Sequence, residues 1–198
     1  MEVSLERAAV ASTKALVIVN ELLFASLAIF FFVKIFKRTL SQLGLTTARL
    51  LHNVTFGLLV GVGGWLAAVA LAFLLTRLVP YEIPEWFTEM LTATSPLDLA
   101  IFLLLTWVLI GPCEEIFFRG FVQGTFAAWK GPVVGLIVGS ILFGLAHFDP
   151  VTWIRTIPST FLGLVYGVVY AKKKSITVVA VAHSVNDTIG FVLAFLAG

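Results

Sequence analysis

The sequence predicts an all-α integral membrane protein, a bundle of about six transmembrane helices around a polar intramembrane cavity. Three observations lead to this prediction. The chain of 198 residues is 60% hydrophobic and 12% charged, about half the charged fraction of a soluble domain. Apolar segments of about 20 residues, the length that crosses a bilayer as a helix, recur along the whole chain. The second half also carries ionisable residues inside such segments, and these usually face a bundle interior or a polar cavity.

Proline and glycine delimit the candidate spans. Pro80, Pro96, Gly131-Pro132 and Asp149-Pro150 mark the joints. The spans are expected at roughly 8–36, 54–79, 98–128, 132–148, 151–171 and 176–197. We expect one membrane domain in two parts: residues 1–94 with the N-terminal transmembrane helices and an acidic connection, and residues 95–198 with the chemically active groups.

The charges between the spans predict an orientation. Three connections contain basic residues and no acid: Lys34, Lys37, Arg38, Arg49, Lys130, Lys172, Lys173 and Lys174. The connection 80–98 instead holds four acids: Glu82, Glu85, Glu89 and Asp98. By the positive-inside rule the basic connections are cytoplasmic, which places both termini outside, and we expect a multi-pass protein of the cell membrane. The basic residues form no stripe or arm, so we expect no nucleic acid partner.

The run Cys113-Glu114-Glu115-Ile116-Phe117-Phe118-Arg119-Gly120 holds three ionisable groups in an apolar segment. Glu115 and Arg119 are four residues apart with the acid first, the favoured order for an ion pair on a helix. Glu114 points about 100° away from Glu115 and has no local cation. We therefore interpret Glu115 with Arg119 as a structural support, and Glu114 as a candidate general base.

The spacing around Lys130 suggests a partner for Glu114. If 98–128 and 132–148 form an antiparallel hairpin about Trp129–Gly131, residues equidistant from the turn share a height. Glu114 lies 16 residues before Lys130 and His147 lies 17 residues after it. Both would then lie about 25 Å from the turn. His183, nine residues beyond Lys174, reaches a similar depth.

Other polar groups in the spans have several interpretations. His183 and Asp187 share one helical face, which could bind a metal ion, donate hydrogen bonds to an oxyanion, or let Asp187 fix the tautomer of His183. Cys113 is the only cysteine, and we interpret it as a buried packing residue rather than a nucleophile. Lys14, Asn20 and Glu21 are interpreted as residues that snorkel or pair.

Three motifs in order resemble a known family. Glu114-Glu115-x-x-x-Arg119, Phe143-x-x-x-His147 and His183-x-x-x-Asp187 are similar to the signature of the CAAX prenyl protease and bacteriocin-processing family of intramembrane peptidases, called CPBP or Abi. The resemblance covers residues 95–198. It implies an all-helical fold around a cavity, and hydrolysis of peptide bonds.

The resemblance also implies roles for single residues. Glu114 and His147 would activate the attacking water, Glu115 and Arg119 would support the first motif, and His183 with residue 187 would stabilise the oxyanion. Residue 187 is often asparagine in the family, and here it is aspartate. An ionised aspartate cannot donate to an oxyanion, so the role of Asp187 stays open.

The cofactor prediction stays open between zinc and no metal. The family is commonly labelled metalloprotease, but a metal-free, glutamate-dependent mechanism has also been proposed for it. The chain lacks the helical His-Glu-x-x-His site. If a metal ion binds, the expected ligands are Glu114, His147 and His183.

We therefore expect an endopeptidase that acts in the lipid bilayer on membrane-associated peptides or proteins, with prenylated CAAX tails as one substrate class. Two alternatives remain. One is a non-catalytic membrane protein that binds a partner or confers bacteriocin immunity. The other is a transporter or proton relay, although the sequence shows no inverted repeat of the kind found in many transporters.

Overall fold

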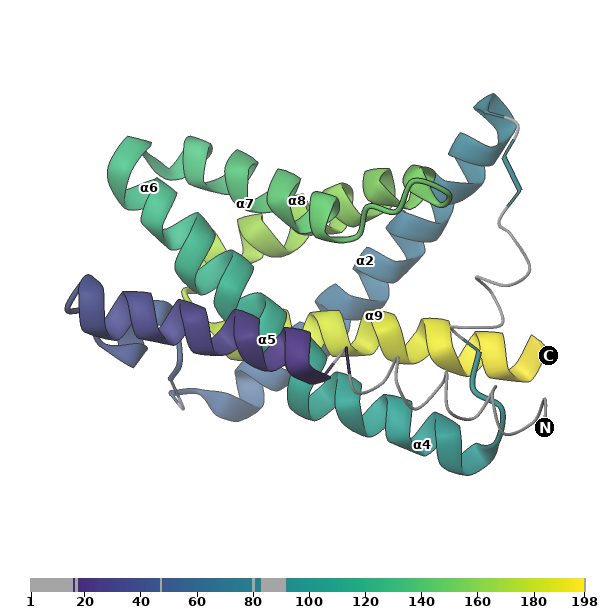
Figure 1. Ribbon diagram of the computed structural model, residues 1–198, viewed down its shortest axis with the longest axis horizontal. Helices are drawn as coiled ribbons and strands as arrows, with labels where there is room; N and C mark the ends of the chain where they lie inside the picture. The colour runs from purple at the N-terminus through teal and green to yellow at the C-terminus, as the bar shows by residue number, and fades with distance from the viewer. Residues whose placement is uncertain (1–15, 17, 47, 80, 83–91, 198) are drawn as a thin grey trace.

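The computed structural model is a bundle of helices (Figure 1) and describes residues 16, 18–46, 48–79, 81–82 and 92–197. Its helices are the first helix Ile18–Ile35, α2 Leu50–Leu78, α4 Pro96–Leu105, α5 Gly111–Glu115, α6 Gly124–Lys130, α7 Pro132–Ala146, α8 Thr156–Lys173 and α9 Ile176–Ala197. Two π-helical segments, Thr106–Ile110 and Ile116–Gln123, join α4, α5 and α6 into one helix, Pro96–Lys130. The described residues contain no β-strand. The predicted all-helical fold is confirmed.

Five helices of the described part are long and apolar enough to cross a membrane: Ile18–Ile35, Leu50–Leu78, Pro96–Lys130, Trp153–Lys173 and Ile176–Ala197. Their outer surfaces expose large apolar side chains, such as Leu59 and Phe73 of α2, as expected for a surface that contacts lipid. The fourth predicted span, 132–148, is the shorter helix α7, which has 15 residues and a length of about 22 Å. The protein is thus a multi-pass membrane protein. Residues 8–15 of the first predicted span lie outside the described residues.

The hairpin predicted about Trp129–Gly131 is present. α6 ends at Lys130, Gly131 has a positive φ of 94°, and α7 begins at Pro132. A Cβ on Gly135 would lie 2.5 Å from the Gln123 carbonyl oxygen. The rings of Phe118 and Phe143 meet at 5.3 Å between centroids. This register places His147, one turn beyond Phe143, at the height of the two glutamates.

The two arms of the hairpin do not stay together. In Figure 1, α7 and the helix that contains α5 separate with distance from the turn. α7 ends at Ala146, and the chain then turns through Asp149, whose Oδ1 accepts hydrogen bonds from the backbone N–H groups of Val151 and Thr152 at 2.8 and 3.0 Å. The arms therefore form a wedge whose open end lies near the glutamates.

Helix α9 reaches the centre of the bundle because two neighbouring helices present glycine to it. A Cβ on Gly61 of α2 would lie 2.6 Å from the carbonyl oxygen of Ala182, and one on Gly111 would collide with the Ser184 hydroxyl. The Ser184 hydroxyl also donates to the carbonyl oxygen of Thr106 at 3.1 Å, within the first π segment. His183, between Ala182 and Ser184, is held deep in the bundle by these contacts.

We predict that Gly61→Ala destabilises the fold and Gly63→Ala does not. The new methyl group at position 61 meets backbone, so α9 must move, and such overpacking costs about 1–3 kcal/mol. Gly63 is two residues further along the same helix and faces the opposite side, and a Cβ there meets nothing within 4 Å. Thermal unfolding of both variants in detergent measures the difference. Equal melting temperatures would show that the close contact between α2 and α9 does not matter.

Candidate active site

His183 is the centre of the candidate site, and both of its ring nitrogens face carboxylates. Nδ1 lies 3.0 Å from Oε1 of Glu115, and Nε2 lies 3.5 Å from Oδ2 of Asp187, one turn further along α9. His183 is 3% exposed. Ionised carboxylates only accept hydrogen bonds, and an imidazole donates from both nitrogens only as the cation. The surroundings therefore favour a positively charged His183.

The ion pair predicted between Glu115 and Arg119 is present and fully buried. Arg119 Nε lies 3.0 Å from Glu115 Oε2, and both side chains have no exposed surface. The guanidinium carbon lies 4.3 Å from the ring centroid of Phe143 and 5.8 Å from that of Tyr166. These rings hold the planar cation in place. Arg119, Glu115, His183 and Asp187 thus form a chain of alternating charge.

Glu114 lies beside this chain but is not tied into it. Its side chain is buried, and its Oε2 has no hydrogen-bond partner among the described residues. A buried carboxylate oxygen with no protein donor is available for a water molecule or a substrate group. Glu114 is thus the carboxylate of the first motif that is free to do chemistry.

Glu21 of the first helix belongs to the same cluster, although the sequence suggested only snorkelling or pairing for it. Glu21 is 3% exposed, and its Oε2 is also without a hydrogen-bond partner among the described residues. Phe24 stacks on Phe117 with 4.8 Å between centroids. Glu21 and Glu114 each precede these stacked rings by three residues, and the two carboxylates lie within electrostatic range of each other.

His147 is oriented by its own helix. Its Nδ1 lies 2.8 Å from the carbonyl oxygen of Phe143. A carbonyl oxygen can only accept, so Nδ1 carries the proton and a neutral ring keeps its lone pair on Nε2. The Phe143 ring contacts both imidazoles, at 4.7 Å from His147 and 5.6 Å from His183.

The structure therefore brings most of the predicted site residues together, and the predicted pair of Glu115 with Arg119 is present, but Glu114 and His147 are not joined directly. Glu115, Arg119, His183 and Asp187 are joined by direct ion pairs, and Glu114 lies next to them. His147 reaches the predicted height, yet no hydrogen bond or ion pair in the described part of the chain joins it to Glu114. The open end of the hairpin wedge accounts for this separation.

The predicted metal ligands do not form a metal site in this arrangement. No group of three or more His, Cys, Asp or Glu side chains within the described residues could hold a metal ion. Both nitrogens of His183 face carboxylates, and Nδ1 of His147 faces a carbonyl oxygen. Glu114, His147 and His183 therefore do not fit a zinc centre, and the mechanism proposed below uses no metal. Cys113 is a buried free thiol.

Comparison with known proteins agrees with the resemblance stated above. The family model described as type II CAAX prenyl endopeptidase Rce1-like matches residues 96–189, the stretch that contains all three motifs. Comparison with curated proteins and with solved structures gives no match. The match supports a protease of the CAAX type in a multi-pass membrane protein. Residues 96–189 of the chain are thus similar to the Rce1-like family of type II CAAX prenyl endopeptidases.

Proposed function

We propose that this protein is an intramembrane endopeptidase that hydrolyses membrane-associated, CAAX-type substrates with a water molecule activated by Glu114. One observation carries the proposal. A buried carboxylate, Glu114, has an unpartnered oxygen and lies near a second carboxylate, Glu21, and a fixed chain of alternating charges. Such a group can take a proton from water in a site that largely excludes bulk solvent.

In the first step the water oxygen attacks the peptide carbonyl carbon while its proton passes to Glu114. Nε2 of His147, with its lone pair facing away from Phe143, accepts a second hydrogen bond from the same water and aligns it. In this proposal water and the peptide bind between the two groups, toward the open end of the hairpin wedge. His147 thereby acts across the wedge, without direct contact with Glu114.

The attack forms a new C–O bond and moves the carbonyl electron pair onto oxygen. In this mechanism His183 supplies positive charge to this oxyanion. Its Nε2 lies 3.5 Å from Asp187, longer than an ordinary N–H···O bond, so the Nε2–H group is only weakly engaged and is available to donate to the oxyanion. Preorganised donors of this kind are commonly worth a factor of about 10²–10³ in kcat.

In this mechanism Asp187 and Glu115 have the same task, to keep His183 charged. Asp187 does not donate to the oxyanion. When the tetrahedral intermediate collapses, the C–N bond breaks and Glu114 returns its proton to the leaving amine. Glu21 helps at both stages, because two neighbouring buried carboxylates readily hold one proton between them.

A cleavage assay tests this function. The purified protein is reconstituted in liposomes with two membrane-bound peptides of the same sequence, one prenylated and one carrying an unrelated acyl chain. We expect cleavage of membrane-bound peptide, with the prenylated form preferred. Proton-driven flux without any cleavage would instead support a transporter, and absence of both would support a binding or immunity protein.

A further inference from the structure

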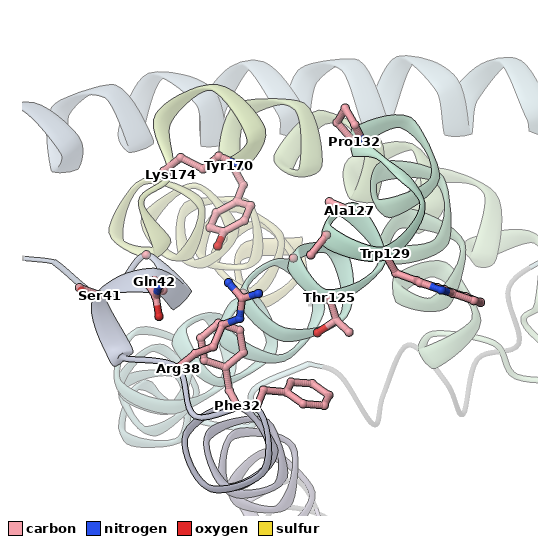
Figure 2. Close-up of a pocket in the computed structure, with 15 residues that line it drawn as sticks. Phe32, Arg38, Ser41, Gln42, Thr125, Ala127, Trp129, Pro132, Tyr170 and Lys174 are labelled. Atoms are coloured by element: carbon pink, nitrogen blue, oxygen red, sulfur yellow. The ribbon is translucent and has the colours of Figure 1, made fainter.

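A pocket of about 910 Å³ lies at the basic end of the bundle, away from the candidate active site. It opens between the end of the first helix, the short turn Leu40–Leu43, α6 and the end of α8 (Figure 2). None of the proposed active-site residues lines it. Its walls combine apolar side chains, including Phe32, Phe36 and Trp129, with the cations Arg38 and Lys174.

The pocket is electropositive. No acidic side chain lines it, and in the described part of the chain neither Arg38 nor Lys174 makes an ion pair. Figure 2 shows the Arg38 guanidinium directed into the pocket between Tyr170 and Thr125. The Thr125 hydroxyl is buried and has no hydrogen-bond partner among the described residues. The pocket thus offers two cations and a hydroxyl, and none of the described residues that line it supplies an anion to pair with them.

One wall of the pocket is formed by the turn Leu40–Leu43 and Gly44, and hydrogen bonds to other helices hold this turn in place. The Tyr170 hydroxyl donates to the carbonyl oxygen of Leu43 at 3.0 Å, and the Ile176 N–H donates to that of Gly44 at 2.9 Å. Gly44 has a φ of 86°, and a Cβ there would lie 3.0 Å from the Tyr170 ring. These contacts tie the turn after the first helix to the junction of α8 and α9, so the protein's own hydrogen bonds hold this wall of the pocket in place.

The position of the pocket at the basic end of the bundle indicates which kind of ligand it binds. It is lined by residues of the three basic connections, whose sequences also contain Lys34, Lys130, Lys172 and Lys173. Trp129 is 69% exposed, as is usual for aromatic side chains at the headgroup level. Basic pockets between transmembrane helices on the cytoplasmic side bind anionic lipid headgroups. Apolar walls next to the cations would contact the acyl chains of the same molecule.

We propose that this pocket binds an anionic phospholipid of the leaflet on the basic side. Arg38 and Lys174 hold the phosphate, Thr125 donates a hydrogen bond to it, and Phe36 and Trp129 contact the chains. The bound lipid would bridge the first helix, α6 and α8, and thereby join the helix that carries Glu21 to the rest of the bundle. The proposal does not depend on peptidase activity.

The test is a titration of the full-length protein in neutral detergent with short-chain phosphatidylglycerol, followed by native mass spectrometry. The pocket variant Arg38→Gln/Lys174→Gln is compared with Lys34→Gln/Lys172→Gln, which removes two cations of the same basic end that do not line the pocket. We expect the pocket variant to bind the lipid about 30-fold more weakly, from about 1 kcal/mol per basic residue, and the control to bind as the wild type does.

Two further arms identify the ligand class. Phosphatidylcholine should bind more weakly than phosphatidylglycerol because it has no net charge. Glycerol phosphate should also bind more weakly, because it has no acyl chains. Equal loss of binding in both double variants would overturn the proposal, since it would show general attraction to a basic surface. Preferential binding of a peptide with a free terminal carboxylate would also overturn it and assign the pocket to substrate.

Discussion

Replacing Glu114 by Gln is expected to lower kcat by about 10²–10⁴, the usual contribution of a general acid–base group. Glutamine has the same shape but cannot accept the proton of the attacking water. The change should leave the fold intact, because Glu114 Oε2 makes no hydrogen bond within the described structure. KM should change little, because the lost interaction belongs to the transition state. Initial rates on a membrane-bound peptide, with thermal unfolding measured on the same preparation, give both quantities.

Two matched variants serve as controls for the effect of Glu114→Gln on kcat. Glu21→Gln should lower kcat less than Glu114→Gln, because the carboxylate that contacts the water is still present. Glu82→Gln removes an exposed glutamate of the acidic connection and should have no effect. Wild-type kcat in a folded Glu114→Gln protein would rule out Glu114 as the base.

Replacing Glu115 by Gln is expected to destabilise the protein more than any other conservative change at the site. The Arg119 guanidinium has no exposed surface and would lose its only ion-pair partner in the described structure. His183 would lose one of the two carboxylates that face its ring nitrogens. Breaking a buried ion pair on one side commonly costs about 3–5 kcal/mol. Arg119→Met should cost less, because Glu115 still faces His183 at 3.0 Å. Unfolding by denaturant in mixed micelles compares the two variants.

The double variant Glu115→Leu/Arg119→Met separates stability from activity. An apolar pair of similar volume can replace a buried ion pair at little cost in stability, so the double variant should be more stable than Glu115→Gln. It should still be inactive, because nothing then holds Nδ1 of His183. If the double variant lost stability equal to the sum of the single changes, the two residues would not act as a pair.

Local patterns in the sequence predicted the features that depend on neighbouring residues. Apolar length located the helices, and Gly131-Pro132 located the hairpin turn. Spacing of four residues predicted the pairing of Glu115 with Arg119 and the shared face of His183 and Asp187. These predictions succeed because helix geometry alone brings residues four apart together.

Contacts between distant segments were not predictable in the same way. Nothing near Glu21 indicates that its helix packs on Phe117, and this packing is what brings Glu21 to Glu114. The contact of Glu115 with His183 joins residues 68 positions apart. Equal distance from the hairpin turn predicted that His147 and Glu114 share a height. It could not predict how far apart the two side chains lie, because the two helices diverge from the turn. The one feature of the sequence that could have pointed to Glu21 as a site residue was its position as an acidic residue inside the first apolar segment.

Water is the nucleophile in this account, and the most direct test is a single turnover in water enriched in heavy oxygen, with enzyme in excess over peptide. Mass spectrometry then measures both the peptide product and the intact protein. We predict that the new carboxylate of the product carries the label and that the mass of the protein is unchanged. A covalent peptide adduct, or label transferred to Glu114 or Cys113, would show that a side chain attacks the substrate and would contradict the account.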